Sequence, residues 1–208
     1  MRISGGTLRG RTVHCPPGVI RPAMDRMRES FFSILGPLEG RSFLDLFSGS
    51  GLVGLEAYSR GARPVVLVER DGGKRRVIRR NLEGLDQPPQ LRIEPAERYV
   101  ARTRTPFSIV YLDPPFDYPH KLDLLQRIAR SRIVQEGTEV LMHLPTGEAL
   151  PERIGAERSG APPGALCLRD RRVYGGSALS FFRLESIAEE SDGADNGAAT
   201  CYDQDDHD

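Results

Sequence analysis

Apolar and polar residues follow a regular order along the chain, and this order predicts a succession of strands and helices. Apolar runs of strand length occur at residues 43–47, 64–68, 90–94, 107–112 and 138–144, and helical spacing begins at Leu52 and near residues 73–84, 96–103 and 119–132. Such alternation is typical of a parallel sheet with helices on both faces. Two more strands, near residues 165–174 and 177–184, have no helix between them and are expected to pair antiparallel. We therefore predict an α/β fold with a mostly parallel, seven-stranded sheet.

The segment that precedes this repeating part has a different pattern. Residues 2–14 alternate around glycines, as in a short β-hairpin, and Arg21-Pro22 then interrupts the chain. A helix is expected to follow, with an apolar face that we assign to the core: Met24, Met27, Phe31, Ile34 and Leu35. We divide the chain into an N-terminal extension (residues 1–36), an α/β domain (37–184) and a tail (185–208).

The formal net charge of zero conceals two parts of opposite character. The chain beyond Arg183 contains nine acidic residues and no Lys or Arg, and this Ser-, Gly- and Ala-rich tail is expected to be disordered. The rest carries 29 basic and 20 acidic residues, a net charge of +9, which suits a polyanionic partner. Six arginines and a single acid, Asp25, lie within the first 28 positions, where a merely solvated basic face is the alternative interpretation.

A glycine-rich turn follows the first strand of the α/β domain. Ser48-Gly49-Ser50-Gly51 stands between this strand and a helix, an arrangement that opens nucleotide-binding α/β units. Glu69 ends the next strand, 18 positions after Gly51, where an acid binds ribose hydroxyls. This arrangement fits NAD or S-adenosylmethionine. Asp45 favours S-adenosylmethionine, because a carboxylate suits its amino group and repels a diphosphate; the alternative role of Asp45 is to cap the turn.

A second motif, Asp113-Pro114-Pro115-Phe116, stands at the end of the fourth predicted strand. The exocyclic amine of a nucleobase is a poor nucleophile, because its lone pair is delocalised into the ring. Asp113 and the Pro114 carbonyl are suited to accept the amine N–H groups and aim the lone pair out of the base plane, while Phe116 stacks on the base. The two prolines lock φ and stiffen the loop. Taken alone, the motif also fits an ordinary turn.

Taken together, these motifs resemble those of the bacterial 16S rRNA guanine-N2 methyltransferases. The likeness extends over residues 2–183 and includes the N-terminal block Arg2–Arg11, Arg21-Pro22 with the helix Asp25–Leu35, and the closing strands Tyr174–Arg183. The N-terminal block is the specific part, since many methyltransferases share the other two motifs.

The resemblance implies a Rossmann-like class I methyltransferase fold and a defined reaction. A methyl group would pass from S-adenosylmethionine to the exocyclic N2 amine of one guanine in 16S ribosomal RNA, leaving S-adenosylhomocysteine and requiring no metal. The implied catalytic residues are Asp113, Pro114, Pro115 and Phe116. The implied cofactor-binding residues are Asp45, Phe47, Ser48, Gly49, Ser50, Gly51, Glu69, Arg70, Glu94 and Ala96. The expected RNA-binding residues are Arg9, Arg11, Arg21, Arg26 and Arg28.

The chain departs from the family pattern at two places. Such enzymes usually carry an acid after the third strand that binds the adenine amine, and Glu94-Pro95-Ala96-Glu97 stands there, so either Glu94 or Glu97 takes that role. The usual acid near the end of the fifth strand is also absent, and Met142-His143 occupies its place. We interpret His143 as a structural residue.

Three other functions stay open at this stage. A DNA amino-methyltransferase, acting on adenine N6 or cytosine N4, shares the Asp-Pro-Pro-aromatic motif, but no insertion large enough for a DNA recognition domain is visible. The glutamine methyltransferases of release factors use Asn where this chain has Asp113. A non-catalytic ribosome-assembly factor that binds RNA and the cofactor is the third alternative.

The composition of the chain indicates which partners and which cellular location to expect. Cys15, Cys167 and Cys201 are too few and too scattered for a disulfide framework or a zinc site. No apolar run approaches the length of a membrane span and no signal peptide opens the chain. We expect a cytoplasmic monomer that acts on 16S rRNA or the small ribosomal subunit and has no membrane partner.

Overall fold

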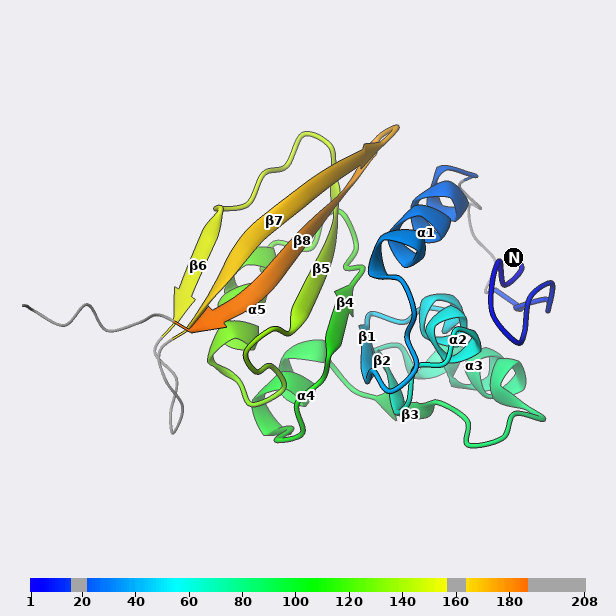
Figure 1. The fold of residues 1–208 in the computed structure, drawn as a ribbon. Coiled ribbons are helices and arrows are strands. Elements are labelled where there is room, and N and C mark those ends of the chain that lie inside the picture. Colours follow the sequence, from blue (N-terminus) through cyan, green and yellow to red (C-terminus); the bar gives the residue numbers. More distant parts are fainter. Residues whose placement is uncertain (16–21, 157–163, 187–208) are drawn as a thin grey trace, which may run out of the picture.

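The sheet at the centre of the protein has eight strands in the order β3-β2-β1-β4-β5-β8-β7-β6 (Figure 1). The computed structural model describes residues 1–15, 22–156 and 164–186. The strands are β1 Phe43–Leu46, β2 Val65–Glu69, β3 Gln90–Ile93, β4 Ile109–Leu112, β5 Glu139–Pro145, β6 Arg153–Ala156, β7 Gly164–Tyr174 and β8 Ser177–Ser186. The helices are α1 Pro22–Leu35, α2 Leu52–Ser59, α3 Arg75–Leu82, α4 Ala96–Arg102 and α5 Lys121–Arg130, with a short 3₁₀ turn, η1, at Gly72–Lys74. Among these described helices, none combines the length and apolarity needed to cross a membrane.

Strands β1 to β5 are parallel, and helices cover both faces of this half of the sheet. Side chains of β1 alternate between the faces, so Leu44 packs with α4 and α5 while Phe43 packs with α1 and α2. Strands β1, β2 and β4 are fully buried, which explains their continuous apolar runs in the sequence, whereas β3 at the edge of the sheet is partly exposed. The predicted α/β fold and its strand–helix alternation are confirmed.

The predicted number of seven strands is wrong, because β6 adds an eighth. The strand has only four residues, Arg-Ile-Gly-Ala. It includes a glycine and lacks an alternation of apolar and polar residues, so the sequence alone does not indicate a strand. Pairing with the long strand β7 creates it, through partners such as Arg153 and Cys167. The expected antiparallel pairing of β7 with β8 is confirmed, and β8 runs two residues past the predicted domain end to Ser186. Residues 187–208 of the predicted tail lie outside the described residues.

The N-terminal arm, residues 1–15, pairs with itself antiparallel as the predicted hairpin does, through a single β-bridge between Arg2 and Thr12. The Ile3 amide donates to the Arg11 carbonyl at 3.1 Å, and the Val13 amide donates to the Met1 carbonyl at 2.9 Å. Within residues 1–15 the structure assigns no strand. Packing also holds the arm, since Ile3 and Val13 are buried against Leu52 and Leu55 of α2. A hairpin of two strands is marginal in water, so burial against the domain supplies the order that a short ladder lacks.

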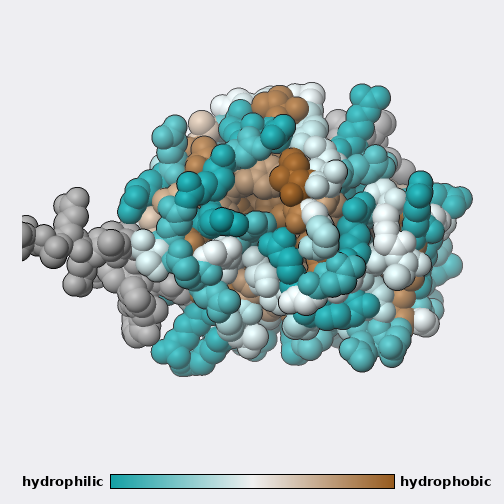
Figure 2. All heavy atoms as spheres, in the orientation of Figure 1, coloured by the Kyte–Doolittle hydropathy of each residue, from teal (hydrophilic) through white to brown (hydrophobic). Residues whose placement is uncertain are grey.

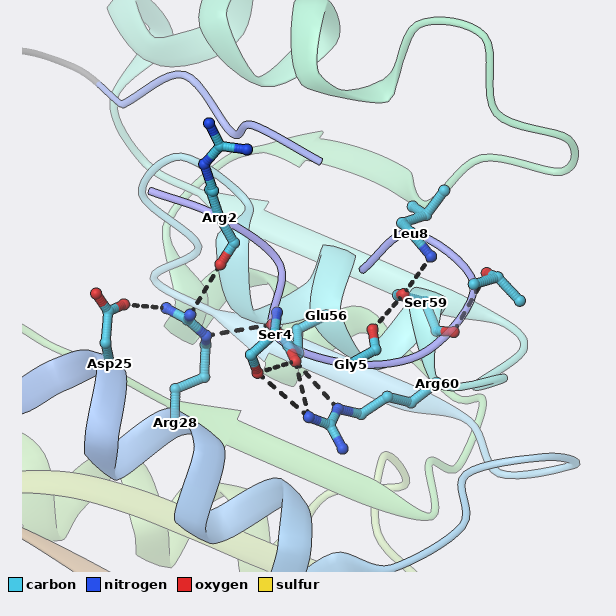
Figure 3. Close-up of polar contacts among 10 residues, drawn as sticks. Arg2, Ser4, Gly5, Leu8, Asp25, Arg28, Glu56, Ser59 and Arg60 are labelled. Carbon is cyan, nitrogen blue, oxygen red and sulfur yellow. Dashed lines mark hydrogen bonds and ion pairs between the residues drawn. The ribbon is translucent and has the colours of Figure 1, made fainter. Parts of the chain in front are cut away.

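Ser59, the last residue of α2, receives the arm through four hydrogen bonds, one of them from the Thr7 hydroxyl to the Ser59 carbonyl at 3.3 Å (Figure 3). Its Oγ donates to the Gly5 carbonyl at 2.6 Å and accepts from the Leu8 amide at 2.8 Å. Its carbonyl accepts from the Thr7 amide at 2.7 Å. Gly6 makes this approach possible, because a Cβ there would lie 1.9 Å from the Ser59 carbonyl oxygen.

A buried carboxylate, Glu56 of α2, joins the arm, α1 and α2 (Figure 3). It accepts hydrogen bonds from the Ser4 amide at 2.9 Å and the Ser4 hydroxyl at 2.6 Å. Arg60 Nη2 pairs with it at 2.9 Å, and Arg28 Nε lies 3.3 Å from it in an ion pair without hydrogen-bond geometry. Arg28 also pairs with Asp25 at 2.6 Å and donates to the Arg2 carbonyl at 3.0 Å. Glu56 is fully buried, so the desolvation cost of its carboxylate is offset by the interactions with these partners.

The predicted apolar face of α1 is partly wrong. Met27 and Phe31 are buried as expected, but Ile34 is 45% exposed and borders a groove of ≈ 520 Å³ against Phe181 and Phe182. Figure 2 shows hydrophobic residues in the hollow between α1 and β8, among hydrophilic residues that cover most of this face. The side chain of Met24 lies outside the described residues.

Replacing Glu56 by glutamine is expected to lower the free energy of unfolding by about 3 kcal/mol, because the buried Arg28 then loses its buried counter-charge and keeps only the more exposed Asp25. Urea denaturation measures this loss. The matched control is Glu39→Gln, the same change at an exposed position, with an expected effect within about 0.5 kcal/mol. Equal losses in the two variants would contradict the role given to Glu56.

Candidate active site

A cavity of ≈ 790 Å³ opens at the carboxyl ends of β1, β2, β4 and β5. β1 is the central one of the five parallel strands; the chain continues from β1 to β2 and β3 on one side of it and then crosses to β4 on the other side. Ligands bind at such a switch point because the loops diverge there and leave a crevice. The cavity is lined by the last residue of β2, by His143 within β5 and by residues that follow β1, β2, β3 and β4: Phe47, Gly49, Glu69, Arg70, Asp71, Gly72, Lys74, Ala96, Glu97, Asp113, Pro114, Pro115, Phe116, Tyr118 and His143.

The turn after β1 is held in an unusual backbone conformation. Phe47 has φ 66° and Gly51 has φ 80°, both in the left-handed region, which costs about 1–2 kcal/mol for a residue with a Cβ. Ser48 holds the turn by donating from Oγ to the carbonyls of Asp45 and Val68, at 2.8 and 3.0 Å. A strained non-glycine residue beside a cavity is typical of a binding site, and Phe47 lines this one.

Asp45 lies beneath this turn and does not line the cavity. Its Oδ2 accepts the Gly54 amide at 3.0 Å. Burial raises the pKa of the Asp45 carboxyl well above its ordinary value; the Gly54 hydrogen bond opposes the rise, and the charges of Asp113 and Glu69 add to it. The Gly54 hydrogen bond fits the alternative interpretation, a side chain that anchors the turn, and the contact of Asp45 with the amino group of a methionine moiety stays a prediction.

Glu69 ends β2 with its carboxylate at the cavity wall. Its two oxygens accept from the amides of Gly49 and Asp71, each at 2.8 Å, and from Lys74 Nζ at 3.2 Å. A carboxylate has about four lone-pair positions, so these donors leave one for a ligand hydroxyl. Glu69 thus retains the hydrogen-bonding capacity that its predicted role requires.

On the opposite wall, Glu97 rather than Glu94 faces the cavity. Glu94 is paired with Arg102, whereas Glu97 accepts a hydrogen bond from the Tyr118 hydroxyl. Burial, followed by the Glu97 carboxylate, raises the pKa of Tyr118. The Tyr118 and Phe47 rings meet edge to face, with centroids 5.4 Å apart. Of the two acids that the sequence left open, Glu97 is the one placed to meet a ligand.

The Asp113–Phe116 loop follows β4 and forms the remaining wall of the cavity. Lys121 holds the loop, since its Nζ donates to the Phe116 carbonyl at 2.7 Å and pairs with Glu148 at 3.0 Å. Asp113 Oδ1 lies 2.6 Å from His143 Nδ1. The sequence interpretation of His143 as merely structural missed this pairing, because it depends on the register between β4 and β5.

The predicted cofactor residues divide into two groups. Phe47, Gly49, Glu69, Arg70 and Ala96 line the cavity together with all four predicted catalytic residues. Ser48, Ser50 and Gly51 belong to the turn but not to the cavity wall. The sequence analysis did not single out Asp71, Lys74 or Tyr118, whose positions depend on how the loops fold back over the sheet edge.

The predicted RNA-binding arginines have different environments. Arg9 and Arg26 are exposed, and Arg21 lies outside the described residues. Arg11 Nη2 donates to the carbonyls of Asn81 and Glu83, at 3.1 and 2.7 Å. Arg28 does not fit its prediction, because it is only 4% exposed and its guanidinium is engaged by the Glu56 network.

Within residues 1–15, 22–156 and 164–186, no group of three or more His, Cys, Asp or Glu side chains is arranged to hold a metal ion.

Comparison with known proteins gives extensive matches. The chain is 32% identical over 190 residues to a Bacillus subtilis protein named "Putative rRNA methyltransferase YlbH", covering 88% of this chain and 98% of that protein. It is 40% identical over 120 residues to the Escherichia coli "Ribosomal RNA small subunit methyltransferase D", covering 56% and 60% of the two chains. The solved structure titled "Putative methyltransferase yhhF from Escherichia coli" superposes with a TM-score of 0.75 at 27% identity, covering 90% of this chain and 99% of that one.

The family model described as "Conserved hypothetical protein 95" matches residues 1–182. This range contains the N-terminal arm, the glycine turn, the Asp113–Phe116 loop and most of β8. The chain therefore belongs to this family, and its predicted resemblance to the bacterial 16S rRNA guanine-N2 methyltransferases is confirmed.

Proposed function

We propose that this protein transfers a methyl group from S-adenosylmethionine to the exocyclic N2 amine of a guanine in 16S ribosomal RNA of the small subunit. The observation that carries the proposal is a single cavity lined both by the strained turn after β1 and by Asp113-Pro114-Pro115-Phe116. One motif suits the cofactor and the other suits a planar amine. Relatives named for the methylation of ribosomal RNA support the choice of substrate.

The cofactor half of the cavity offers suitable partners for S-adenosylmethionine. Glu69 would bind the ribose hydroxyls, Glu97 and Ala96 would bind the adenine, and the Gly49 backbone would approach the methionine moiety closely. When bound, S-adenosylmethionine supplies a methyl group on a sulfonium sulfur; its transfer to nitrogen leaves the S–C electron pair on sulfur and releases one proton from the amine. Asp45 acts through the turn that it anchors.

The substrate half consists of groups that orient an amine. The Asp113 carboxylate and the Pro114 carbonyl accept the two N–H groups, and Phe116 provides a ring face for the base. A guanine reaches this depth only after leaving its stack. Asp113 is then also placed to take the released proton, so positioning and one proton acceptor are what the protein contributes.

Exposed arginines on the arm and α1 provide the contact with RNA in this proposal. Arg9 and Arg26 are exposed, whereas Arg28 is buried and stabilises the fold. Arg11 ties the arm to the end of α3, a helix that exposes Arg79 and Arg80 as well. Phosphate contacts by such residues orient the RNA without reading its sequence.

The reaction is tested by transfer of labelled methyl from S-adenosylmethionine to small subunits and to free 16S rRNA from cells that lack this gene. The expected product nucleoside is N2-methylguanine at one site. Asp113→Ala is expected to abolish transfer while leaving the affinity for S-adenosylhomocysteine within a few-fold, because Asp113 serves the amine. The control is Asp117→Ala, an exposed acid of the same loop. Methylated DNA, or cofactor binding without transfer to either RNA, would instead favour the alternative functions.

The role of Asp45 predicts a stability that depends on pH. Its raised pKa means that the folded protein loses stability as the pH rises above the ordinary carboxyl value of 3.8 toward the folded-state value. Asp45→Asn keeps an oxygen acceptor for the Gly54 amide and lacks the charge. Its melting temperature is therefore expected to exceed that of the wild type by a larger margin at about pH 8 than at about pH 4.

Thermal unfolding of the cofactor-free protein measures these margins, with Asp117→Asn as the exposed control. Because Asp45 acts through the turn, Asp45→Asn is also expected to keep its affinity for S-adenosylhomocysteine within a few-fold. A loss of about 10- to 100-fold would instead indicate a direct ion pair between Asp45 and the cofactor's amino group.

The double variant Arg9→Ala/Arg26→Ala is expected to bind 16S rRNA more weakly. The slope of log affinity against log salt concentration should fall by about 0.7–0.9 for each phosphate contact removed. Filter binding over a range of salt concentrations measures both quantities. Arg153→Ala, at the exposed edge strand β6, is the control and should leave the slope unchanged. An unaltered slope in the double variant would place the RNA contact elsewhere.

A further inference from the structure

His143 and Asp113 lie side by side because of the register between two parallel strands. Leu112 of β4 is paired with Met142 of β5, so the next residues of the two strands are neighbours on the same face of the sheet. His143 Nδ1 and Asp113 Oδ1 are 2.6 Å apart. The histidine side chain is 2% exposed and that of Asp113 is 25% exposed, so a buried group holds one that faces the cavity.

The burial of His143 is not explained by stability. Its Nε2 atom is buried, and no partner for it is found within the described part of the chain. An unpartnered buried polar atom costs about 1–3 kcal/mol, which an apolar side chain would avoid. The neighbouring positions of β5, from Val140 to Leu144, are otherwise apolar. A histidine at this buried position therefore indicates a role other than packing, and that role depends on its hydrogen bond with the Asp113 carboxylate.

The contact leaves the two oxygens of Asp113 with different partners. A carboxylate only accepts hydrogen bonds, so we assign a ring proton of His143 to Nδ1, which donates it to Oδ1. Oδ1 is then occupied by His143, and Oδ2 is left for an amine N–H. The imidazole also meets the Phe116 ring edge to face, at 5.2 Å between centroids and 74° between planes. One buried ring therefore supports both the carboxylate and the stacking face.

We infer that His143 is a positioning residue for methyl transfer, which holds Asp113 so that Oδ2 and the Phe116 ring meet the same base. This inference rests on the proposed function. A freely rotating carboxylate would present its oxygens in many directions, whereas a fixed one accepts the amine hydrogen in a single geometry. His143 does not itself touch the substrate amine in this arrangement.

Two substitutions separate positioning from packing. His143→Leu fills the site with an apolar side chain and removes the donor, whereas His143→Asn keeps a short N–H donor near the position of Nδ1. Groups that orient metal ligands by hydrogen bonds are worth about 10- to 100-fold in activity, and we take the same factor for a histidine that orients Asp113. We expect His143→Leu to lower kcat for methyl transfer by that factor and His143→Asn to restore most of it. The KM for RNA and the affinity for S-adenosylhomocysteine should stay within about twofold in both variants.

The measurement is methyl transfer at saturating cofactor with varied RNA, together with thermal unfolding of each variant. His143→Leu is expected to melt at or above the wild-type temperature, since it removes an unpartnered polar atom. An undiminished kcat in His143→Leu, or equal losses in the leucine and asparagine variants, would overturn the positioning role. A wild-type enzyme inactive on RNA would overturn the proposed function as well, and so is distinguishable from failure of the inference alone.

Discussion

The buried carboxylate of Glu56 holds the N-terminal arm, α1 and α2 in one arrangement. Its partners come from three segments: Ser4 of the arm, Arg28 of α1 and Arg60 after α2 (Figure 3). A fully buried charge is tolerable only while these partners stay in place, which makes the assembly specific. α2 begins at the turn that lines the cavity, so the same residue links the basic arm to the cofactor side of the site.

At the carboxyl ends of the parallel strands, three acidic side chains lie near one another, and each has different hydrogen-bond partners. Asp45 is buried under the turn against the Gly54 amide, Glu69 is held by two backbone amides and Lys74, and Asp113 is held by His143. Their mutual repulsion contributes to the raised pKa of Asp45. The arrangement places negative charge on both sides of the cavity, where a cationic cofactor and an amine donor would meet it.

Much of this organisation was predictable from local patterns. The buried parallel strands are continuous apolar runs, and the glycine turn and the Asp113 motif sit at their ends, so their meeting at one sheet edge follows from the parallel order. Strand β6 and the docked arm were not predictable in the same way. Arg153–Ala156 becomes a strand only beside β7, and the short antiparallel pairing within the N-terminal arm is supplemented by burial of Ile3 and Val13 against α2.

The sequence by itself determined the α/β fold, the family and the two motifs that meet at the cavity, because these depend on short-range periodicity and on residue types at fixed spacing. The tertiary structure alone decided the partners of single side chains. In the fold, Arg28 pairs with Glu56, although the sequence predicted an RNA contact for it. Glu97, not Glu94, lines the cavity, and His143 lies beside Asp113. Each of these outcomes depends on contacts between residues far apart in the chain, which strand register and helix docking set and local sequence does not encode.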